Sequence, residues 1–509
     1  MRVLFVFPDL SSTVTHYTGV PSYGIALLAA ILRRAGHEVS LYHFTHTPDE
    51  GNFRERIAAE RADLVAFSAN SHYARRLAQW TTWTRAAARA PVAVGGIHAT
   101  LAPEQVAALP EVDFTCLGEG EGALPELCHA LEKGADPSRI LNVWARTRDG
   151  IVRNPPRALV QDLDGLPDPD LSLFDFGRLY HTRQGSFTYL MSRGCAFGCT
   201  YCCAHMQRRA APDGSRFWRF LSPRRAAEQL ATLLERHLPG ARQVSFVDAV
   251  LFPDPAWLAE FAPLYRERVG LPFSCNLRAD WVTEETAATL RDMGCEIARF
   301  GVESGNPRIT REVLRRRLDL ADIRRAFALL RAHGIQRWSY NMVGLPTETL
   351  RLALRTARFN AELEPDLALI FIFFPYPGTE LRRRCADAGF LTDREFDHYQ
   401  VSVALHMPQF RENDILFVHR FFRRLVGFYA LPPRAPAWLR RAWPALLDAA
   451  IAGPLLPRGA IIRAYEGYRA LRHRLGESLV RRSPRLYRLL GGREHEARPA
   501  PGHERPVAG

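Results

Sequence analysis

The sequence predicts an α/β protein made of a doubly wound parallel sheet, a partial (β/α)6 barrel and a helical carboxyl-terminal region. In the first 150 residues, short apolar runs rich in β-branched residues alternate with helical patterns, which is typical of a doubly wound sheet. Six further strand–helix units begin at residue 186, as in a parallel barrel. Beyond about residue 400, apolar residues recur at helical spacing.

Five strands are expected in the first sheet, with a first helix at 22–35. The expected strands span 3–7, 39–42, 64–67, 92–94 and 114–116. Ligands of doubly wound sheets bind beyond the carboxyl ends of the strands. The small or polar residues found at those ends are Ser68, Gly95, Gly96, Gly118 and Glu119. Turn chemistry alone also explains glycines at such positions, so they carry a binding site only together with other evidence.

The barrel is expected to present its functional residues at the carboxyl ends of its strands. Its expected strands span 187–191, 243–247, 273–276, 297–302, 339–343 and 367–374, and its helices 223–237, 256–267, 283–293, 320–333 and 348–362. Asp248, Arg278 and Glu303 follow three of these strands. After the sixth, prolines and a glycine in 374–379 dictate a turn, and Thr379 is expected to cap the next helix.

Composition shifts suggest five regions along the chain. We expect a first domain at 1–150, a proline- and aspartate-rich linker at 151–180, the barrel at 181–400, a helical region at 401–493 and a disordered tail at 494–509.

The bulk composition favours an ordinary globular protein of 509 residues with 47% hydrophobic and 24% charged residues. The net charge of +13 is almost all arginine, with Lys133 as the single lysine, and the arginines are scattered among acidic residues. This pattern argues against a nucleic-acid partner. Nine cysteines without a disulfide-like spacing indicate a reducing, cytoplasmic setting. The sequence contains no apolar stretch of about 18 residues, so we do not expect a membrane-spanning helix.

Three cysteines, Cys195, Cys199 and Cys202, form a Cys-x3-Cys-x2-Cys loop directly after the first barrel strand. Three thiolates can hold a [4Fe-4S] cluster and leave its fourth iron open for a chelating ligand. Gly194 and Gly198 suit a loop that wraps closely round a cluster. The alternative is a zinc site completed by Cys203 or His205, although no second cysteine knuckle is present.

This triplet resembles the signature of the radical S-adenosylmethionine (SAM) superfamily, and Tyr201 fits the aromatic residue preferred before the third cysteine. The resemblance implies that SAM chelates the open iron and that an electron from the cluster cleaves it to a 5'-deoxyadenosyl radical. Glu303, in a Gly-Val-Glu-Ser-Gly segment, resembles the residue that accepts hydrogen bonds from the SAM ribose. Arg278 either neutralises the SAM carboxylate or forms an ion pair with Asp280 or Asp248. Asp248 stands where relatives carry paired acids, but Ala249 replaces the second one, which leaves the role of Asp248 in doubt.

The first domain resembles the flavodoxin-like cobalamin-binding domain of one large radical SAM subgroup. The strand-proline loop, the segment 94–98 and the turn 118–121 carry this resemblance, which makes Ser68, Gly95, Gly96, Gly118 and Glu119 candidate cobalamin contacts. Domains that ligate cobalt from below carry Asp-x-His-x-x-Gly. Here Val14 replaces the aspartate, so His16 lacks its orienting acid and is expected not to be a ligand.

The combined resemblance implies a radical methyltransferase that uses one SAM as methyl source and a second as radical source. Two alternatives stay open: a cyclase or rearrangement enzyme like the anaerobic Mg-protoporphyrin monomethyl ester cyclase, and a non-catalytic cobalamin carrier or sensor. The expected partners are a small-molecule substrate and an electron donor such as flavodoxin or ferredoxin. The arginine-flanked carboxyl-terminal helices either cap the barrel or contact a membrane surface.

Overall fold

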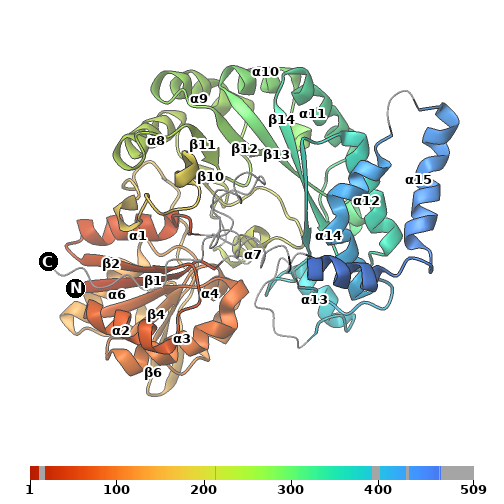
Figure 1. Ribbon diagram of the computed structural model, residues 1–509. Helices are drawn as coiled ribbons and strands as arrows, with labels where there is room; N and C mark the ends of the chain where they lie inside the picture. Colours follow the sequence, from red (N-terminus) through yellow and green to blue (C-terminus); the bar gives the residue numbers. More distant parts are fainter. Residues whose placement is uncertain (11–17, 213, 393–401, 432–434, 469–470, 472–509) are drawn as a thin grey trace, which may run out of the picture.

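The computed structural model describes residues 1–10, 18–212, 214–392, 402–431, 435–468 and 471. Two mainly parallel sheets form its framework, and Figure 1 shows the amino-terminal, seven-stranded sheet below the curved, six-stranded one. The Tyr23 hydroxyl, on the first helix, donates to the main-chain oxygen of Thr188 in the curved sheet at 2.5 Å, so the two layers are bonded directly. His16 and the expected disordered tail at 494–509 lie outside the described residues.

The first sheet has the strand order β2-β1-β3-β4-β5-β6-β7. Its strands are β1 (Arg2–Pro8), β2 (Glu38–Phe44), β3 (Leu64–Ser68), β4 (Val92–Gly95), β5 (Phe114–Cys116), β6 (Val143–Thr147) and β7 (Gly150–Arg153). Strands β1 to β5 are parallel, and β1 pairs with both β2 and β3. This order confirms the predicted doubly wound, flavodoxin-like fold. The antiparallel pair β6–β7 extends the sheet beyond β5 and was not expected, because its residues alternate with exposed arginines.

Helices cover both faces of the first sheet, which explains the continuous apolar runs of its strands. They are α1 (Tyr23–Arg34), α2 (Glu50–Glu60), α3 (Ala74–Ala87), α4 (Ile97–Leu101), α5 (Pro103–Ala107) and α6 (Ala123–Lys133). Neighbouring side chains of β1 point to opposite faces: Phe5 packs with α1 and α6, whereas Leu4 packs with α2 and α3.

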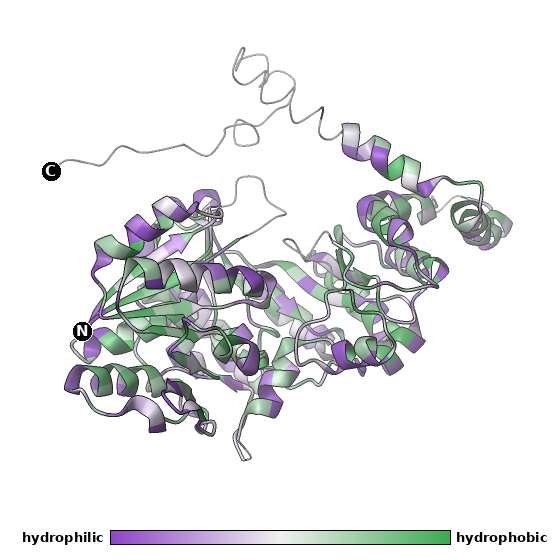
Figure 2. Ribbon diagram, turned by 90° about the horizontal axis from the view of Figure 1, so that it is seen from below, coloured by the Kyte–Doolittle hydropathy of each residue, from purple (hydrophilic) through white to green (hydrophobic). Residues whose placement is uncertain are grey.

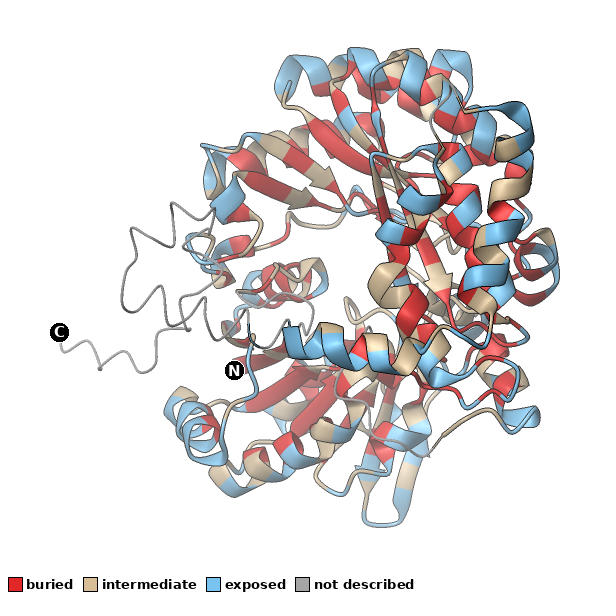
Figure 3. Ribbon diagram, turned by 45° about the vertical axis from the view of Figure 1, so that its right-hand side comes forward, coloured by how far each residue is buried: buried red, intermediate tan, exposed pale blue. Residues whose placement is uncertain are grey.

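The second sheet has the order β15-β14-β13-β12-β11-β8, and all its pairs are parallel. Its strands are β8 (Ser186–Tyr189), β11 (Gln243–Phe246), β12 (Phe273–Leu277), β13 (Cys295–Glu303), β14 (Gln336–Val343) and β15 (Leu367–Ile372). Helices α8 (Pro223–His237), α9 (Pro255–Arg268), α10 (Glu284–Asp292), α11 (Leu320–Ala332) and α12 (Leu350–Leu363) lie outside its curve (Figure 1). The predicted six-unit partial barrel is therefore confirmed. Figure 3 shows its strands buried and the outward faces of its helices exposed.

Each of the five barrel helices starts after a side chain that accepts a hydrogen bond from the first turn. These caps are Ser222, Asp254, Thr283, Asp319 and Thr349. Such caps satisfy main-chain donors that a helix leaves free at its amino end. The caps fix where each helix begins, and thereby the length of the loop that precedes it at the carboxyl end of the strand.

A short insertion between β8 and α8 carries the cysteine loop. Strand β9 (Ser192–Arg193) pairs antiparallel with β10 (Arg219–Phe220), and α7 (Cys203–Ala210) begins directly after Cys202. Helix α7 contacts α4 of the first sheet, and Figure 1 shows it between the two layers. The insertion therefore places the cysteines between the two domains.

The carboxyl-terminal helices close one side of the barrel. Thr379 accepts a hydrogen bond from the Arg382 main chain at 3.3 Å and caps α13 (Glu380–Asp387), as predicted. Helix α14 (Glu412–Tyr429) packs against α12 and β15, and α15 (Ala437–Ala452) packs against α12 and α14. Figure 2 shows hydrophobic residues concentrated in the strands and hydrophilic ones on the outer helices. Among the described helices, none is long and apolar enough to cross a bilayer.

Glu348, in the loop after β14, is a fully buried carboxyl group. Its Oε2 accepts hydrogen bonds from the main-chain N–H groups of Gly344 and Leu345, at 2.8 and 3.1 Å. No described residue donates to its Oε1. Burial raises the pKa of Glu348 to about 8, although the two main-chain bonds act in the opposite direction. The group therefore holds its proton near neutral pH.

Stability should consequently fall as pH rises from about 5 to about 8. In that range the folded state holds a proton that the unfolded chain has released, so the free energy of unfolding falls by up to about 1.4 kcal/mol per pH unit. Glu348→Gln keeps the acceptor oxygen and does not titrate. We expect its melting temperature, relative to the native chain, to rise steadily from pH 5 to 8 and then level off. Glu362→Gln, at an exposed position on α12, is the control. A difference between Glu348→Gln and the native chain that is constant over this range would contradict the prediction.

Candidate functional site

The three predicted cluster cysteines lie on one loop, each half-buried and without a disulfide. Gly194 opens the loop at φ +79°, and a Cβ there would meet the Phe217 main-chain oxygen at 2.3 Å, so only glycine fits. Burial raises the pKa of Cys199, and Cys195 adds to this, whereas the Arg316 and Arg278 guanidinium groups act against it. Two arginine side chains from other segments therefore lie near Cys199. Their positive charge favours the thiolate form, which is the form that binds metal.

The donor set of this loop fits a four-iron cluster. Cys195 and Cys199 both act on the pKa of Cys202, which burial raises to about 11, so the three thiols lie within electrostatic reach of one another. Over the described ranges, no three His, Cys, Asp or Glu side chains converge closely enough to hold a single metal ion. A cubane is wider than one ion and takes three thiolates at separate corners. Cys203, one of the two residues that could complete the alternative zinc site, is half-buried at the start of α7.

Glu303 lies at the end of β13 and connects to the cysteine loop through Tyr201. Its Oε1 accepts hydrogen bonds from the Tyr201 hydroxyl at 3.1 Å and from Arg316 at 2.6 Å. Burial raises the pKa of Glu303, and the Arg316 charge acts against this shift. Arg316 is buried and Tyr201 is half-buried, so the carboxylate is held beside the loop in one orientation.

Gly301 makes room for this arrangement. A Cβ at Gly301 would lie 2.4 Å from Oε1 of Glu303 and 2.5 Å from a nitrogen of Arg316. The register of β13 against β14 shifts between Gly301 and Glu303, and Glu303 takes a positive φ of 63°. Such strain in a buried polar residue is typical of a functional site.

Replacing Glu303 with glutamine should weaken SAM binding by about tenfold to a hundredfold, because a neutral amide replaces a charged acceptor of hydroxyl donors. Glu296→Gln, at an exposed position on the same strand, should bind SAM like the native chain. Equilibrium dialysis of labelled SAM against the reconstituted protein measures the change. Equal affinities of Glu303→Gln and the native chain would remove Glu303 from the SAM site.

Arg278 pairs with Asp280, one of the two interpretations that the sequence left open. Its Nε lies 2.8 Å from Asp280, and it donates to the Arg317 main-chain oxygen at 2.6 Å. The guanidinium group stacks over the Phe197 ring of the cysteine loop at 3.9 Å. Arg278 is thus already engaged and buried, and a contact to the SAM carboxylate stays a prediction.

Asp248 supports the start of the cysteine loop. Its Oδ1 accepts hydrogen bonds from the Met191 main chain at 3.1 Å and from the Ser192 hydroxyl, while no described residue donates to Oδ2. Burial raises the pKa of Asp248 to about 6, against the effect of these bonds. Since Ser192 belongs to β9, Asp248 holds the strand that leads into Cys195.

One cavity of about 660 Å³ lies between the first domain and the barrel. All five candidate cobalamin contacts of the first domain line it: Ser68, Gly95, Gly96, Gly118 and Glu119. On the barrel side its wall includes Ser192, Arg193 and Gly194. The cavity therefore reaches the residue that precedes Cys195, although the role of each lining residue in cobalamin binding stays a prediction.

The cavity continues as a slot into the first domain. Phe5, Ala66 and Ala93 of the strands line it on one side, and Leu28 of α1 and Leu124 of α6 line it on the other. The alanines leave space between the sheet and the two helices that larger side chains would fill. A slot beyond the carboxyl ends of parallel strands fits the nucleotide tail of a cobalamin.

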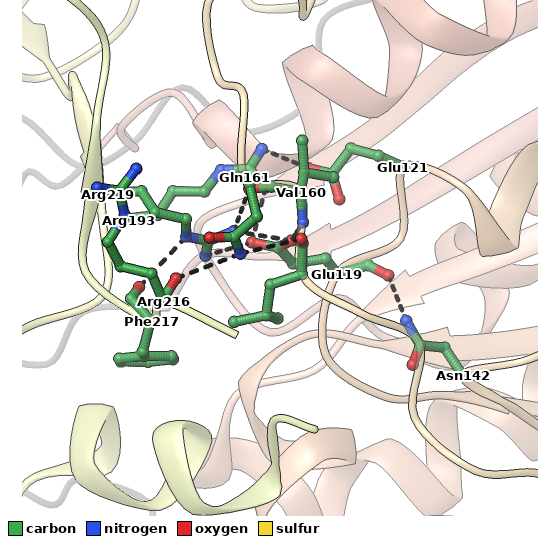
Figure 4. A network of polar contacts seen from close by, with 10 residues as sticks. Glu119, Glu121, Asn142, Val160, Gln161, Arg193, Arg216, Phe217 and Arg219 are labelled. Carbon is green, nitrogen blue, oxygen red and sulfur yellow. Dashed lines mark hydrogen bonds and ion pairs between the residues drawn. The ribbon is translucent and has the colours of Figure 1, made fainter. Parts of the chain in front are cut away.

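Charged residues join the two domains at the rim of this cavity (Figure 4). Oε1 of Glu119 lies 2.7 Å from Arg219 and 2.9 Å from Arg193, and Oε2 accepts the Val160 main-chain N–H at 2.8 Å. Burial alone would raise the pKa of Glu119, but the bonds from Arg219 and the two arginine charges outweigh it and lower the pKa. Glu119 thus holds together the first domain, the linker and the barrel.

The turn after β15 forms a second junction with the first domain. The Tyr376 hydroxyl and His72 Nε2 lie 3.1 Å apart, and a Cβ at Gly378 would meet the Leu101 main-chain oxygen at 3.0 Å. Burial lowers the pKa of His72 to about 3, so its ring is neutral. The segment 374–379 is therefore a domain contact as well as a turn and a cap.

Sequence reasoning missed Arg316, Arg193, Arg219 and Glu121. The arginine run 315–317 after the Glu303 segment was the available signal for Arg316, whose Nε is buried with no acceptor among the described residues. Arg193 stands two positions before Cys195. Nothing local distinguishes Arg219, because its partner Glu119 lies 100 residues away.

Two family models match the chain in consecutive segments. A B12-binding domain matches residues 13–128, and the radical SAM superfamily matches residues 189–359. A protein of Pyrococcus horikoshii described as an uncharacterised methyltransferase, PH0819, is 28% identical over 85% of this chain and 93% of its own length. The anaerobic magnesium-protoporphyrin IX monomethyl ester cyclase of Rubrivivax gelatinosus is 24% identical over 80% of this chain and 74% of its own length.

The fold is shared with a solved structure. That structure is the radical SAM methyltransferase TsrM of Kitasatospora setae with cobalamin and a [4Fe-4S] cluster bound, which matches with a TM-score of 0.60 at 20% identity over 76% of this chain and 75% of its own. The order of the two domain matches is the one that the sequence predicts.

Proposed function

The chain belongs to the cobalamin-dependent radical SAM enzymes, and from this premise we propose that it transfers a methyl group from SAM to an unactivated carbon of a small-molecule substrate. One observation supports this proposal above the others. A single cavity runs from the slot of the first domain to Gly194, next to the first cluster cysteine. When bound, the cluster supplies the electron that cleaves SAM, and cobalamin carries the methyl group.

In this proposal the protein's own residues bind the cluster and SAM, orient the groups that contact SAM and shield the site from solvent. Cys195, Cys199 and Cys202 hold the cluster. Glu303 binds the SAM ribose, and the Tyr201 hydroxyl orients the Glu303 carboxylate. Arg316, cationic and buried beside Cys199 and Glu303, is better placed than Arg278 to bind the SAM carboxylate.

Aromatic residues cover one side of the loop. The Phe197 ring packs against Trp218 and Trp281, and Arg278 stacks on its face. A dry surrounding strengthens the electrostatic contacts of the site and protects a reactive intermediate from solvent.

Product analysis tests the proposal. Methyl transfer requires that 5'-deoxyadenosine and S-adenosylhomocysteine form in equal amounts, together with a product heavier by one methylene. Cyclisation or rearrangement is the second candidate, favoured by the match to the R. gelatinosus cyclase. It gives 5'-deoxyadenosine without S-adenosylhomocysteine, and that result would replace the proposal.

An acidic electron-transfer protein such as flavodoxin or ferredoxin is the proposed reductant. Ala196 and Gly198 of the cysteine loop are exposed, and so are Arg208 and Arg209 on α7. Arg208 donates to the Ala196 main-chain oxygen at 3.2 Å, which places positive charge at the loop. A donor with an acidic face would dock there by charge complementarity. The nine free thiols are consistent with a reducing, cytoplasmic setting.

A membrane contact through α15 is proposed as well. Trp438 and Leu446 are exposed on α15 and Leu455 is exposed just after it, and the neighbouring Arg440 and Arg441 are exposed too. An apolar face flanked by arginines fits the surface of an anionic bilayer. We expect Trp438→Glu to weaken co-sedimentation of the protein with phosphatidylserine vesicles. Equal co-sedimentation of this variant and the native chain would exclude the contact.

A further inference from the structure

Glu121 has one carboxylate oxygen in use and one without a donor. Its Oε1 is bonded to Arg193 across the domain boundary, whereas no described residue donates to Oε2. The side chain is only 10% exposed and belongs to the cavity wall. A buried carboxylate oxygen without a donor destabilises the fold, because it has lost its hydrogen bonds to water and no protein donor replaces them. The cavity is thus built to receive a hydrogen-bond donor at this point.

The charges around Glu121 specify a neutral donor. Arg193 and Arg219 balance Glu119 and Glu121, and Arg157, the other charged residue of the wall, pairs with Glu126 at 2.6 Å. Burial alone would lower the pKa of Arg193, but the two carboxylates outweigh it, so Arg193 stays cationic. A cationic ligand would leave an excess charge in a buried site. A primary amide supplies an N–H without adding charge.

A corrin ring carries primary amides on its edge. Its propionamide arms project from the lower face, the face from which the nucleotide tail also hangs. Because the slot that fits the tail lies in the first domain, the lower face and these arms turn toward that domain. Glu121 belongs to the same domain, in the turn between β5 and α6.

We infer that Oε2 of Glu121 accepts a hydrogen bond from the primary amide of a corrin propionamide arm, and that Glu121 is thereby a positioning residue for the ring. Oε1 of the same carboxylate holds Arg193, two residues before Cys195. One side chain therefore links the edge of the ring to the start of the cysteine loop. This inference rests on the cobalamin of the proposed function.

Matched corrinoids test the contact. Dissociation constants are measured by absorbance for hydroxocobalamin and for its three monocarboxylic acids, in which one propionamide is a carboxylate. In the native chain one monoacid should bind about tenfold to a hundredfold more weakly than hydroxocobalamin, because its carboxylate faces that of Glu121. In Glu121→Gln, whose amide can donate to a carboxylate, this penalty should shrink to within about twofold. Glu104→Gln, an exposed residue of the same domain outside the cavity wall, should keep the full penalty.

Two results would overturn the inference. One is that Glu121→Gln leaves all four affinities as in the native chain. The other is that it weakens all four by one common factor, which is what a purely structural role predicts. Both results are distinct from a failure of the proposed function, in which the native chain binds no hydroxocobalamin at all.

Discussion

Replacing Cys199 with alanine should abolish the formation of 5'-deoxyadenosine by the reduced protein. A cubane held at three corners keeps its fourth iron open only while all three thiolates are present. With two thiolates left, the cluster is not retained, and the iron content should fall from about four per chain to a small fraction of that value. The same loss is expected for Cys195→Ala and Cys202→Ala.

Cys203→Ala is the matched control. Cys203 is adjacent to Cys202 and half-buried at the first residue of α7, and burial raises its pKa to about 12. Cys203 stands outside the Cys-x3-Cys-x2-Cys spacing that supplies the three thiolates, so this variant should keep its iron and its activity toward SAM. Loss of metal in Cys203→Ala, with zinc rather than iron in the native chain, would contradict the cluster and support the four-ligand zinc site. Iron analysis together with chromatography of the nucleoside products measures both quantities.

Ala93→Leu should weaken cobalamin binding and leave the iron–sulfur cluster in place. Ala93 lines the slot between the first sheet and helices α1 and α6, and it is 2% exposed. Leucine adds three carbons to a space that the cofactor tail is expected to fill, and overpacking of this kind weakens binding by about tenfold to a hundredfold.

The cluster cysteines lie in the other domain, so iron content and SAM cleavage without substrate should stay at native levels in Ala93→Leu. This readout shows that the barrel of the variant has folded. Ala93→Gly, which enlarges the slot instead of filling it, should bind hydroxocobalamin close to the native affinity. Native affinity in Ala93→Leu would mean that the tail does not enter this slot.

The parts of the molecule that local patterns determine could be predicted from the sequence. The parallel strands of the first sheet have helices on both faces and therefore read as continuous apolar runs, as in β1 and β3. The cysteine loop could be predicted because its chemistry depends on spacing within eight residues. The hairpin β6–β7 could not, because it lies at an edge where exposed residues such as Arg153 interrupt the apolar pattern.

The contacts between distant segments escaped sequence reasoning. The carboxylate of Glu119, a candidate cobalamin contact that lines the cavity, is also bonded to Arg219, 100 residues away. The sequence left the role of Asp248 in doubt because Ala249 replaces the second acid. In the structure Asp248 accepts hydrogen bonds from Met191 and Ser192. Such partners depend on how two domains pack, and no local pattern encodes that packing.

One sample decides whether both cofactors share this chain: oxygen-free protein reconstituted with iron, sulfide and hydroxocobalamin, then reduced and examined by electron paramagnetic resonance. We expect about four irons and one bound cobalamin per chain, and a reduced [4Fe-4S] signal that changes when SAM is added. Any of three results would contradict the assignment of this site: no reduced [4Fe-4S] signal, a signal that does not change when SAM is added, or no bound cobalamin.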